Sequence, residues 1–273
     1  MPSSGTDYTK AENIFQPVSA AYAQMRSDIW FPYVCVGDVS SDDSDTGSAV
    51  GDNAYATAMN DFTFEPGNYM FNSLWTGYYN IISAANNAIY QEGKYAEAMK
   101  TEENKLYARQ CANEAKLIRA FAYTWLYRTF GEVPIVRYGM SSSELANNPQ
   151  AKKDELYEYI LKDLDEAIDT LPASYSKVWG TRYTKYTALA LKAKAAMYFG
   201  DWQSAADASG KIITSGKFAL EDDYRYLFSV DGEGCSESLM EIEGSDLGQN
   251  SGEAPYLLYA YYQGPRNNSP SNM

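Results

Sequence analysis

The side chains of this sequence that could do chemistry are carboxylates, tyrosines, lysines and thiols, because none of its 273 residues is a histidine. Histidine-dependent catalytic triads, histidine general bases and HExxH zinc sites are therefore excluded. Paired carboxylates could serve a glycoside hydrolase. With 36 acidic residues, however, pairs are expected from composition alone. We expect Asp163, Asp165 and Glu166 to be solvated charges on an exposed helix face.

An acidic cluster, made of Asp38, Asp42, Asp43 and Asp45, lies within a stretch rich in Gly, Asp, Ser and Asn at residues 37–69. A connection of that length without secondary structure is usually functional. The run that begins at Asp43 resembles a calcium loop, but its twelfth position is Ala54 and not the bidentate glutamate of an EF-hand. Glycine-rich nucleotide motifs are absent as well. We expect neither a metal nor a cofactor.

Aromatic residues are the unusual part of the composition, with 25 tyrosines and an aromatic share of 15%. Four of these rings flank the acidic stretch or lie within it: Trp30, Tyr33, Tyr55 and Tyr69. A flat ring can stack on the apolar face of a sugar, while carboxylates and amides bind its hydroxyls. The pattern therefore indicates a sugar site, although any one ring could instead fill a local apolar cluster.

The charge limits the kinds of partner that the chain can bind, and the cysteine content limits its possible disulfides and metal sites. The net charge of −14 repels nucleic acid and anionic membrane surfaces, so we expect no nucleic-acid partner. Three widely spaced cysteines, Cys35, Cys111 and Cys235, support neither a disulfide scaffold nor a zinc cluster and are expected to be free thiols. No apolar run approaches the length that spans a bilayer.

The elements that must position these residues are helical. Apolar residues recur at helical spacing, and Gly131, Pro134, Pro172 and Gly216 stand where helices should end. The sequence predicts helices at about 68–90, 102–130, 153–171, 184–199 and 202–215, and a first helix that begins or kinks at Pro17. Residues 239–242 alternate as a short strand would. The fold class is therefore all-α with long irregular loops.

The last two predicted helices are joined only by Gly200 and Asp201, with small residues where they would cross. This spacing is typical of a tetratricopeptide hairpin, and a generic antiparallel helix pair is the alternative. We expect Tyr198 and Trp202 to be buried at this helix seam. Glu114 and Arg119 are also expected to be structural.

Several blocks of the sequence occur in the order of a known family. The first is W-x-x-Y-Y-x-I-I-x-x-A-N from Trp75, and the second is E-A-K-x-x-R-A-F-A-Y-x-x-L from Glu114, which continues to F-G-x-V-P-I-V from Phe130. Further blocks lie at 155–172, 182–188, 216–220 and 236–242. Together they cover nearly all of residues 12–243, and the chain resembles the SusD/RagB family.

The resemblance implies an α-helical fold with tetratricopeptide-like helices at about 70–215 and a ligand loop at 37–69. Residues 1–273 would form a single amino-terminal region of the family fold, with its carboxy-terminal half apparently absent. The implied function is non-catalytic binding of a glycan at the extracellular face of the outer membrane. The implied partner is a SusC-like TonB-dependent transporter, and a lipid anchor would precede residue 1.

Candidate ligand contacts follow from the acidic stretch and from the family's use of the loop after its first helix. We expect Asp42, Asp43 and Asp45 to accept hydrogen bonds from sugar hydroxyls and Asn53 to act as an amide partner. Tyr55 would be the stacking platform, and Trp75 could present a ring edge to the same pocket. Three alternatives stay open: a peptide-binding uptake protein of the RagB type, a peptide-binding tetratricopeptide adaptor, and a carboxylate-based glycoside hydrolase.

Overall fold

The computed structural model describes residues 6–26, 29–46, 51, 53–176 and 182–242. All regular secondary structure in these ranges is helical, so the all-α prediction is confirmed. Residues 239–242 are described and are not in a strand, so that prediction is wrong. The chain forms two compact units, one of Met1–Met25 with Ile81–Ile242 and one of Arg26–Asn80 with Glu243–Met273.

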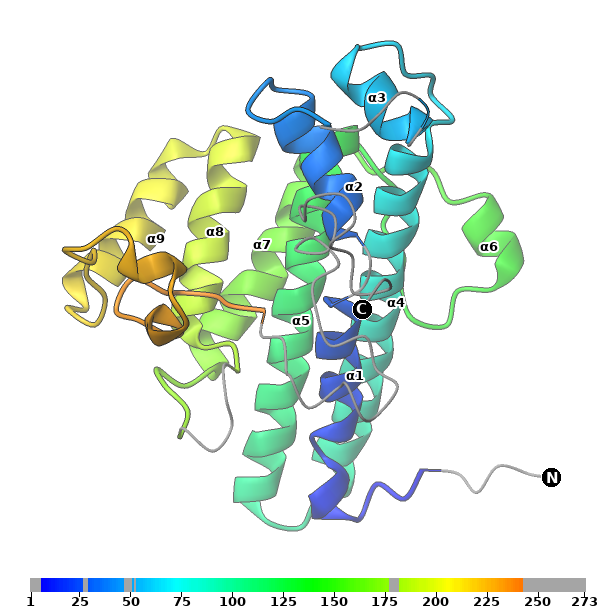
Figure 1. The fold of residues 1–273 in the computed structure, drawn as a ribbon. Helices are drawn as coiled ribbons and strands as arrows, with labels where there is room; N and C mark the ends of the chain where they lie inside the picture. Colours follow the sequence, from blue (N-terminus) through cyan, green and yellow to red (C-terminus); the bar gives the residue numbers. More distant parts are fainter. Residues whose placement is uncertain (1–5, 27–28, 47–50, 52, 177–181, 243–273) are drawn as a thin grey trace, which may run out of the picture. The chain divides into compact units, whose positions relative to one another are not determined.

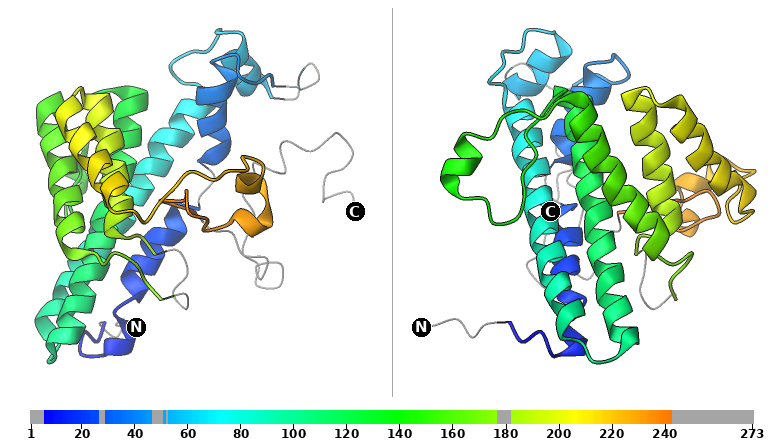
Figure 2. Two further views of the ribbon diagram at one scale, coloured as in Figure 1. Left: turned by 90° about the vertical axis from the view of Figure 1, so that its left-hand side faces the viewer. Right: turned by 180° about the vertical axis from the view of Figure 1, so that it is seen from behind.

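The first unit is a row of neighbouring helices. Within it α5 packs on α7, α7 on α8 and α8 on α9, while α1 packs on α5 (Figure 1). Figure 2 shows the same succession from two further sides. The bounds are α1 (Gln16–Gln24), α4 (Tyr69–Ala98, which crosses the division between the units), α5 (Glu102–Phe130), α6 (Ser142–Ala146), α7 (Lys153–Thr170), α8 (Lys185–Phe199) and α9 (Trp202–Thr214). Three 3₁₀ turns accompany them: η1 (Ala11–Asn13), η4 (Tyr226–Phe228) and η5 (Val230–Gly232).

The predicted ends of α5, α7, α8 and α9 agree closely with these bounds, because they rest on local chemistry, whereas α4 continues to Ala98, beyond the end predicted near residue 90. Pro17 lies in the first turn of α1, where its missing N–H is not needed. Gly200 ends α8 with a left-handed φ of 86°. Asp201 then caps α9 by accepting a hydrogen bond from the backbone N–H of Ser204 at 3.0 Å. Two residues are therefore enough to reverse the chain between α8 and α9.

The aromatic seam beside this turn is built on Phe199. Its ring stacks on Tyr127 at 3.9 Å and on Tyr157 at 4.6 Å between centroids, and the side chain is buried. The expected seam residues behave differently: Trp202 is 68% exposed and Tyr198 is 45% exposed. The prediction that they are buried is wrong, because both side chains are open to solvent beside the turn that joins α8 and α9.

A buried polar cluster joins α4, α5 and α7. Arg119 donates to both carboxylate oxygens of Asp163 at 2.8 Å and to Oδ1 of Asn86 at 2.6 Å. Asn86 in turn donates to the carbonyl of Val136 at 2.9 Å. Arg119 is structural, as predicted. The expectation that Asp163 is a solvated charge is wrong, since its residue exposure is only 3%.

A second buried ion pair connects Glu114 on α5 with Arg182, which lies just before α8. The Arg182 Nε donates to Glu114 at 3.1 Å, and a second guanidinium nitrogen is also bonded to this carboxylate. Tyr22 and Tyr175 donate their hydroxyls to the same carboxylate, at 2.7 and 2.9 Å. Because every lone pair of a buried charge needs a partner, these hydroxyls complete the pair. The structural role predicted for Glu114 is confirmed.

The second unit has its own small core. It contains α2 (Trp30–Val34), the π-helical turn η2 (Cys35–Val39), α3 (Ala54–Asn60) and the first turns of α4. The buried residues of this core are Cys35, Val39, Ala56, Met59 and Met70. The stretch at 37–69 was expected to be irregular throughout, and the presence of η2 and α3 corrects that. Among the described helices, none has both the length and the apolarity needed to cross a membrane.

Candidate functional site

The acidic turn follows η2 directly. The carbonyl of Asp38 accepts hydrogen bonds from the backbone N–H groups of Asp43 and Ser44, at 3.1 and 3.2 Å. Asp42 reaches a φ of 62° to close this turn, a conformation that aspartate tolerates better than most residues. The side chains of Asp42, Asp43 and Asp45 are exposed. The turn therefore presents acceptor oxygens to solvent.

Asn53 makes a contact within the fold that the sequence analysis did not predict. Its Oδ1 accepts a hydrogen bond from the backbone N–H of Ala56 at 3.1 Å, which makes Asn53 the N-cap of α3. An N-cap satisfies one of the free donors at a helix start. The Asn53 carbonyl oxygen therefore has one partner within the fold, and the amide nitrogen carries two N–H donors for the predicted ligand contact.

Tyr55 and Tyr69 form an exposed pair of rings. Their centroids lie 5.7 Å apart with a tilt of 38° between the planes. Tyr55 is 52% exposed and Tyr69 is 53% exposed. Two large rings open to solvent and held in contact make a surface that can accept a flat apolar face. Tyr55 was predicted as the platform, and Tyr69 is the ring beside it.

Asn68 fixes this pair, and the sequence analysis missed it. Its side chain is almost fully buried: Oδ1 accepts from the N–H of Met70 at 2.9 Å, and Nδ2 donates to the carbonyl of Tyr55 at 3.3 Å. Asn68 therefore caps α4 and ties the start of α3 to it. An asparagine directly before an apolar helical run is an N-cap signal, which could have identified this residue.

Trp75 contacts a different ring. Its centroid lies 4.9 Å from that of Tyr79, one helical turn further along α4, and Trp75 is 36% exposed. Burial raises the pKa of the Tyr79 hydroxyl well above its usual value. Six helical positions separate Tyr69 from Trp75, which turns their side chains about 120° apart around the axis. Trp75 thus forms a second ring surface on another face of α4.

Further rings near α3 add apolar surface that the sequence analysis did not single out. Phe62 is 62% exposed and has a left-handed φ of 53°. Its ring lies 6.4 Å from Phe64, whose ring meets the edge of Phe71 at 5.2 Å. These ring contacts between residues 55 and 79 fall into three sets, and Trp30 and Tyr33 form a further pair at 6.1 Å between centroids.

Metal or thiol chemistry finds little support here. No group of three or more His, Cys, Asp or Glu side chains within the described ranges could hold a metal ion. Burial raises the pKa of the Cys35 thiol to about 11, so it stays protonated at neutral pH and is a poor nucleophile. Cys111 is also a free buried thiol, and Cys235 is a free, partly exposed one.

Comparison with known proteins gives one consistent family. A family model of SusD-like proteins, described as starch-binding and associating with the outer membrane, matches residues 13–197. SusD-like protein P2 of Formosa agariphila is 33% identical over 191 residues, which cover 68% of this chain and 36% of that protein. The chain thus spans about a third of the length of this curated relative.

Solved structures agree in fold. A SusD-like protein from Bacteroides fragilis superposes with a TM-score of 0.73 at 19% identity, covering 89% of this chain and 47% of that one. Surface glycan-binding protein A from Bacteroides fluxus superposes with a TM-score of 0.70 at 26% identity, covering 85% and 50%. At such low identity, the first of these shows a common fold only.

Proposed function

This chain belongs to the SusD-like family, and we propose that it binds a glycan at the cell surface without catalysis, for delivery to a TonB-dependent transporter of the SusC type. The family is described as starch-binding and associated with the outer membrane. Beyond this family description, we propose for this chain specific ligand contacts, a place on the extracellular face, a lipid anchor and a transporter partner.

The observation that carries the proposal is the exposed pair of rings, Tyr55 and Tyr69. Exposing two large rings to water is unfavourable unless a ligand or partner covers them. A pyranose has an apolar C–H face of matching size, so stacking there would bury apolar area on both sides. Asn68 ties the backbone of Tyr55 to the start of α4 before any ligand arrives, which lowers the entropy lost on binding.

Hydroxyl recognition is assigned to the acidic turn of the same unit. Asp42, Asp43 and Asp45 offer exposed carboxylate oxygens, and a carboxylate that accepts from a hydroxyl forms a charge-assisted hydrogen bond. The Asn53 amide nitrogen and the Trp75 ring are secondary contacts in this proposal. The neutral sugar requires no compensating cation, which suits a chain with a net charge of −14.

Non-catalytic binding is supported by where the buried carboxylates lie. Glu114 and Asp163 are each held by an arginine within the helical row, and the third buried carboxyl among the described residues, Glu92, is fully enclosed on α4. A glycoside hydrolase would instead need two carboxyl groups facing each other across an open site.

A calorimetric titration tests the proposal, using glucose oligosaccharides with α-1,4 and with β-1,3 linkages. Laminarin is a relevant choice because one similar structure is that of a laminarin-binding SusD-like protein. We expect saturable binding and no shorter products after long incubation. Hydrolysis would favour the enzyme alternative, and competition by a peptide mixture but not by any oligosaccharide would favour the RagB-type alternative.

A further inference from the structure

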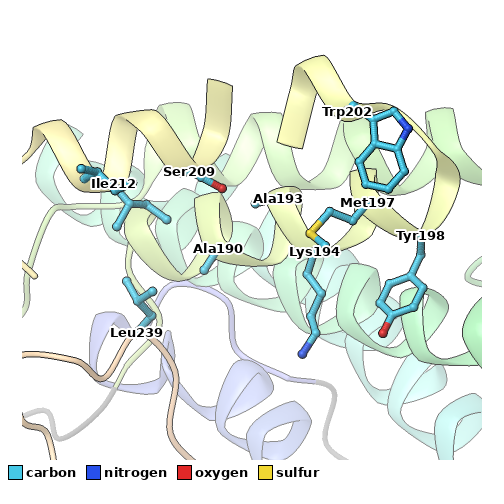
Figure 3. Close-up of a pocket in the computed structure, with 10 residues that line it drawn as sticks. Ala190, Ala193, Lys194, Met197, Tyr198, Trp202, Ser209, Ile212 and Leu239 are labelled. Carbon is cyan, nitrogen blue, oxygen red and sulfur yellow. The ribbon is translucent and has the colours of Figure 1, made fainter. Parts of the chain in front are cut away.

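A groove in the helical row lies between α8 and α9. Its volume is about 660 Å³, and its walls are mostly apolar. In Figure 3, Tyr198 and Trp202 lie at one end of the groove and Ile212 and Leu239 at the other. Lys194 and Ser209 supply polar groups between the two ends. The groove therefore combines an exposed indole and phenol with an ammonium group.

Two cations lie over the ring of Trp125, and one of them, Lys194, also lines the groove. The ammonium of Lys194 lies 5.0 Å from the centroid of the Trp125 ring, and the guanidinium carbon of Arg128 lies 4.8 Å from the same centroid. Arg128 also lies 4.3 Å from the ring of Tyr198. No ion pair found in the described ranges involves either cation.

Arg128 is also short of acceptors. Its Nε and Nη1 atoms are buried and have no hydrogen-bond partner among the described residues. The rings of Trp125 and Tyr198 flank the guanidinium, so they supply only cation–π contacts. Buried donors usually have a partner, and a local positive charge without a carboxylate is unusual on such an acidic chain. An anion would complement this end of the groove.

We propose that the groove between α8 and α9 is a second sugar site, selective for a sugar that carries a carboxylate or a sulfate. Trp202 and Tyr198 would cover the apolar face of the sugar, and Lys194 would bind its acidic group. Arg128 would act as a positioning residue, because it holds the Tyr198 ring and adds positive potential. The site goes beyond the proposed function and depends on it only for the choice of a sugar as ligand.

The net charge of −14 sets a limit on this ligand. A long polyanion would be repelled by the whole chain, as nucleic acid would. A single acidic sugar carries one negative charge. At contact distance, its attraction to the Lys194 ammonium exceeds its repulsion by the more distant acidic residues of the chain. The expected ligand is therefore a glycan with isolated acidic residues.

Nuclear magnetic resonance of the five indole N–H groups tests both sites in one spectrum. The probes are methyl glucoside, methyl glucuronide and methyl glucoside 6-sulfate, which differ only at position 6. We expect the glucuronide, the sulfate or both to shift the Trp202 signal saturably, and the neutral glucoside to shift it at least tenfold more weakly. The response to each anion shows whether the acid is a carboxylate or a sulfate.

Substitutions sharpen the test. Lys194→Met should remove the preference for the anion, whereas Lys211→Met, which removes the same charge from an exposed position on α9 outside the groove, should keep it. Trp202→Ala identifies the signal. Equal shifts from the neutral and acidic sugars, no shift from any of them, or a preference that survives Lys194→Met would overturn the proposal. The Trp75 signal reports on the other unit, so failure there counts against the proposed function separately.

Discussion

Arg119 and Asp163 form a bidentate pair, in which Nε and Nη2 of the guanidinium each donate to one carboxylate oxygen at 2.8 Å. The third contact of the guanidinium, to Asn86, brings a third helix to the same point. Each of the three residues comes from a different block of the family pattern in the sequence. Three blocks of the pattern therefore contribute to a single buried cluster. Asn86 and Asp163 lie 33 and 44 positions from Arg119 along the chain.

Breaking this pair should destabilise the fold strongly. Asp163→Ala leaves the Arg119 charge buried without its carboxylate, and we expect a loss of about 3–5 kcal/mol in the free energy of unfolding. Asp165→Ala is the matched control, because Asp165 is half exposed and its pair with Lys192 is worth about 0–1 kcal/mol. Urea unfolding of both variants gives the comparison. Equal losses would show that burial of the pair is not what matters.

The aromatic seam gives a second contrast between neighbours. Phe199→Ala removes a ring stacked between Tyr127 and Tyr157 and should cost about 3–5 kcal/mol. Trp202→Ala removes a ring that is 68% exposed, and we expect a change within about 0.5 kcal/mol. Thermal melts of the two variants test this. A loss larger than this for Trp202→Ala would show that Trp202 is packed in the aromatic seam after all.

Two glycines of α4 should respond to alanine in opposite directions. A Cβ at Gly77 would lie 2.0 Å from Cγ2 of Ile29, a stiff β-branched side chain, and we expect a loss of about 1–3 kcal/mol. Nothing lies within 4 Å of a Cβ at Gly93, where the same change should gain about 0.5–1 kcal/mol through helix propensity. Chemical denaturation of the two variants measures the change in the free energy of unfolding, which should be a loss at Gly77 and a gain at Gly93. A gain at Gly77 would mean that Ile29 moves aside freely.

Glu92 should make stability depend on pH. Burial, reinforced by Glu114 and opposed by Arg182, raises the pKa of the Glu92 carboxyl to about 9 from 4.5. Both of its oxygens are buried, and the backbone N–H of Val18, which lowers the pKa, offsets only part of this rise. Its stabilising contribution is therefore fully present below pH 4.5 and is lost as pH rises toward 9.

Glu92→Gln, which does not titrate, should remove this loss. The variant should match the parent near pH 4 and gain on it at higher pH, by up to about 1.4 kcal/mol per pH unit. Denaturant titrations at pH 4, 6 and 8 measure the difference between the two proteins. A difference that does not change with pH would show that Glu92 is already ionised in the folded chain.

The helices could be predicted from the sequence because their signals are local. Apolar periodicity and the glycine and proline stops place α5, α7, α8 and α9 to within about a residue or two. The short helices α2 and α3 were not predicted, since five to seven residues are too few to show a helical period in their apolar positions. They are stabilised by a core assembled from distant positions such as Cys35 and Met70.

Side-chain environments could be predicted less well, because they depend on contacts across the fold. Asp163 has the sequence context of a solvated helix acid, and its arginine partner lies 44 positions earlier. Trp202 has the context of a seam residue, yet exposure depends on which face of α9 meets α8. In the candidate site, Tyr55 and Tyr69 could be singled out as rings of the acidic stretch, but their contact and the link made by Asn68 depend on the fold.

The central claim is that Tyr55 and the acidic turn bind a neutral glycan, and calorimetric titration of matched variants with one bound glucose oligosaccharide tests it most directly. Tyr55→Ala and Asp43→Ala are compared with Tyr224→Ala, which removes a ring that is 71% exposed in the other unit. We expect the two site variants to bind about ten- to a hundredfold more weakly with the fold intact, since each loses about 1.5–3 kcal/mol, and the control to bind as the parent does. Affinities for both site variants equal to that of the parent, with unchanged melting temperatures, would contradict the account.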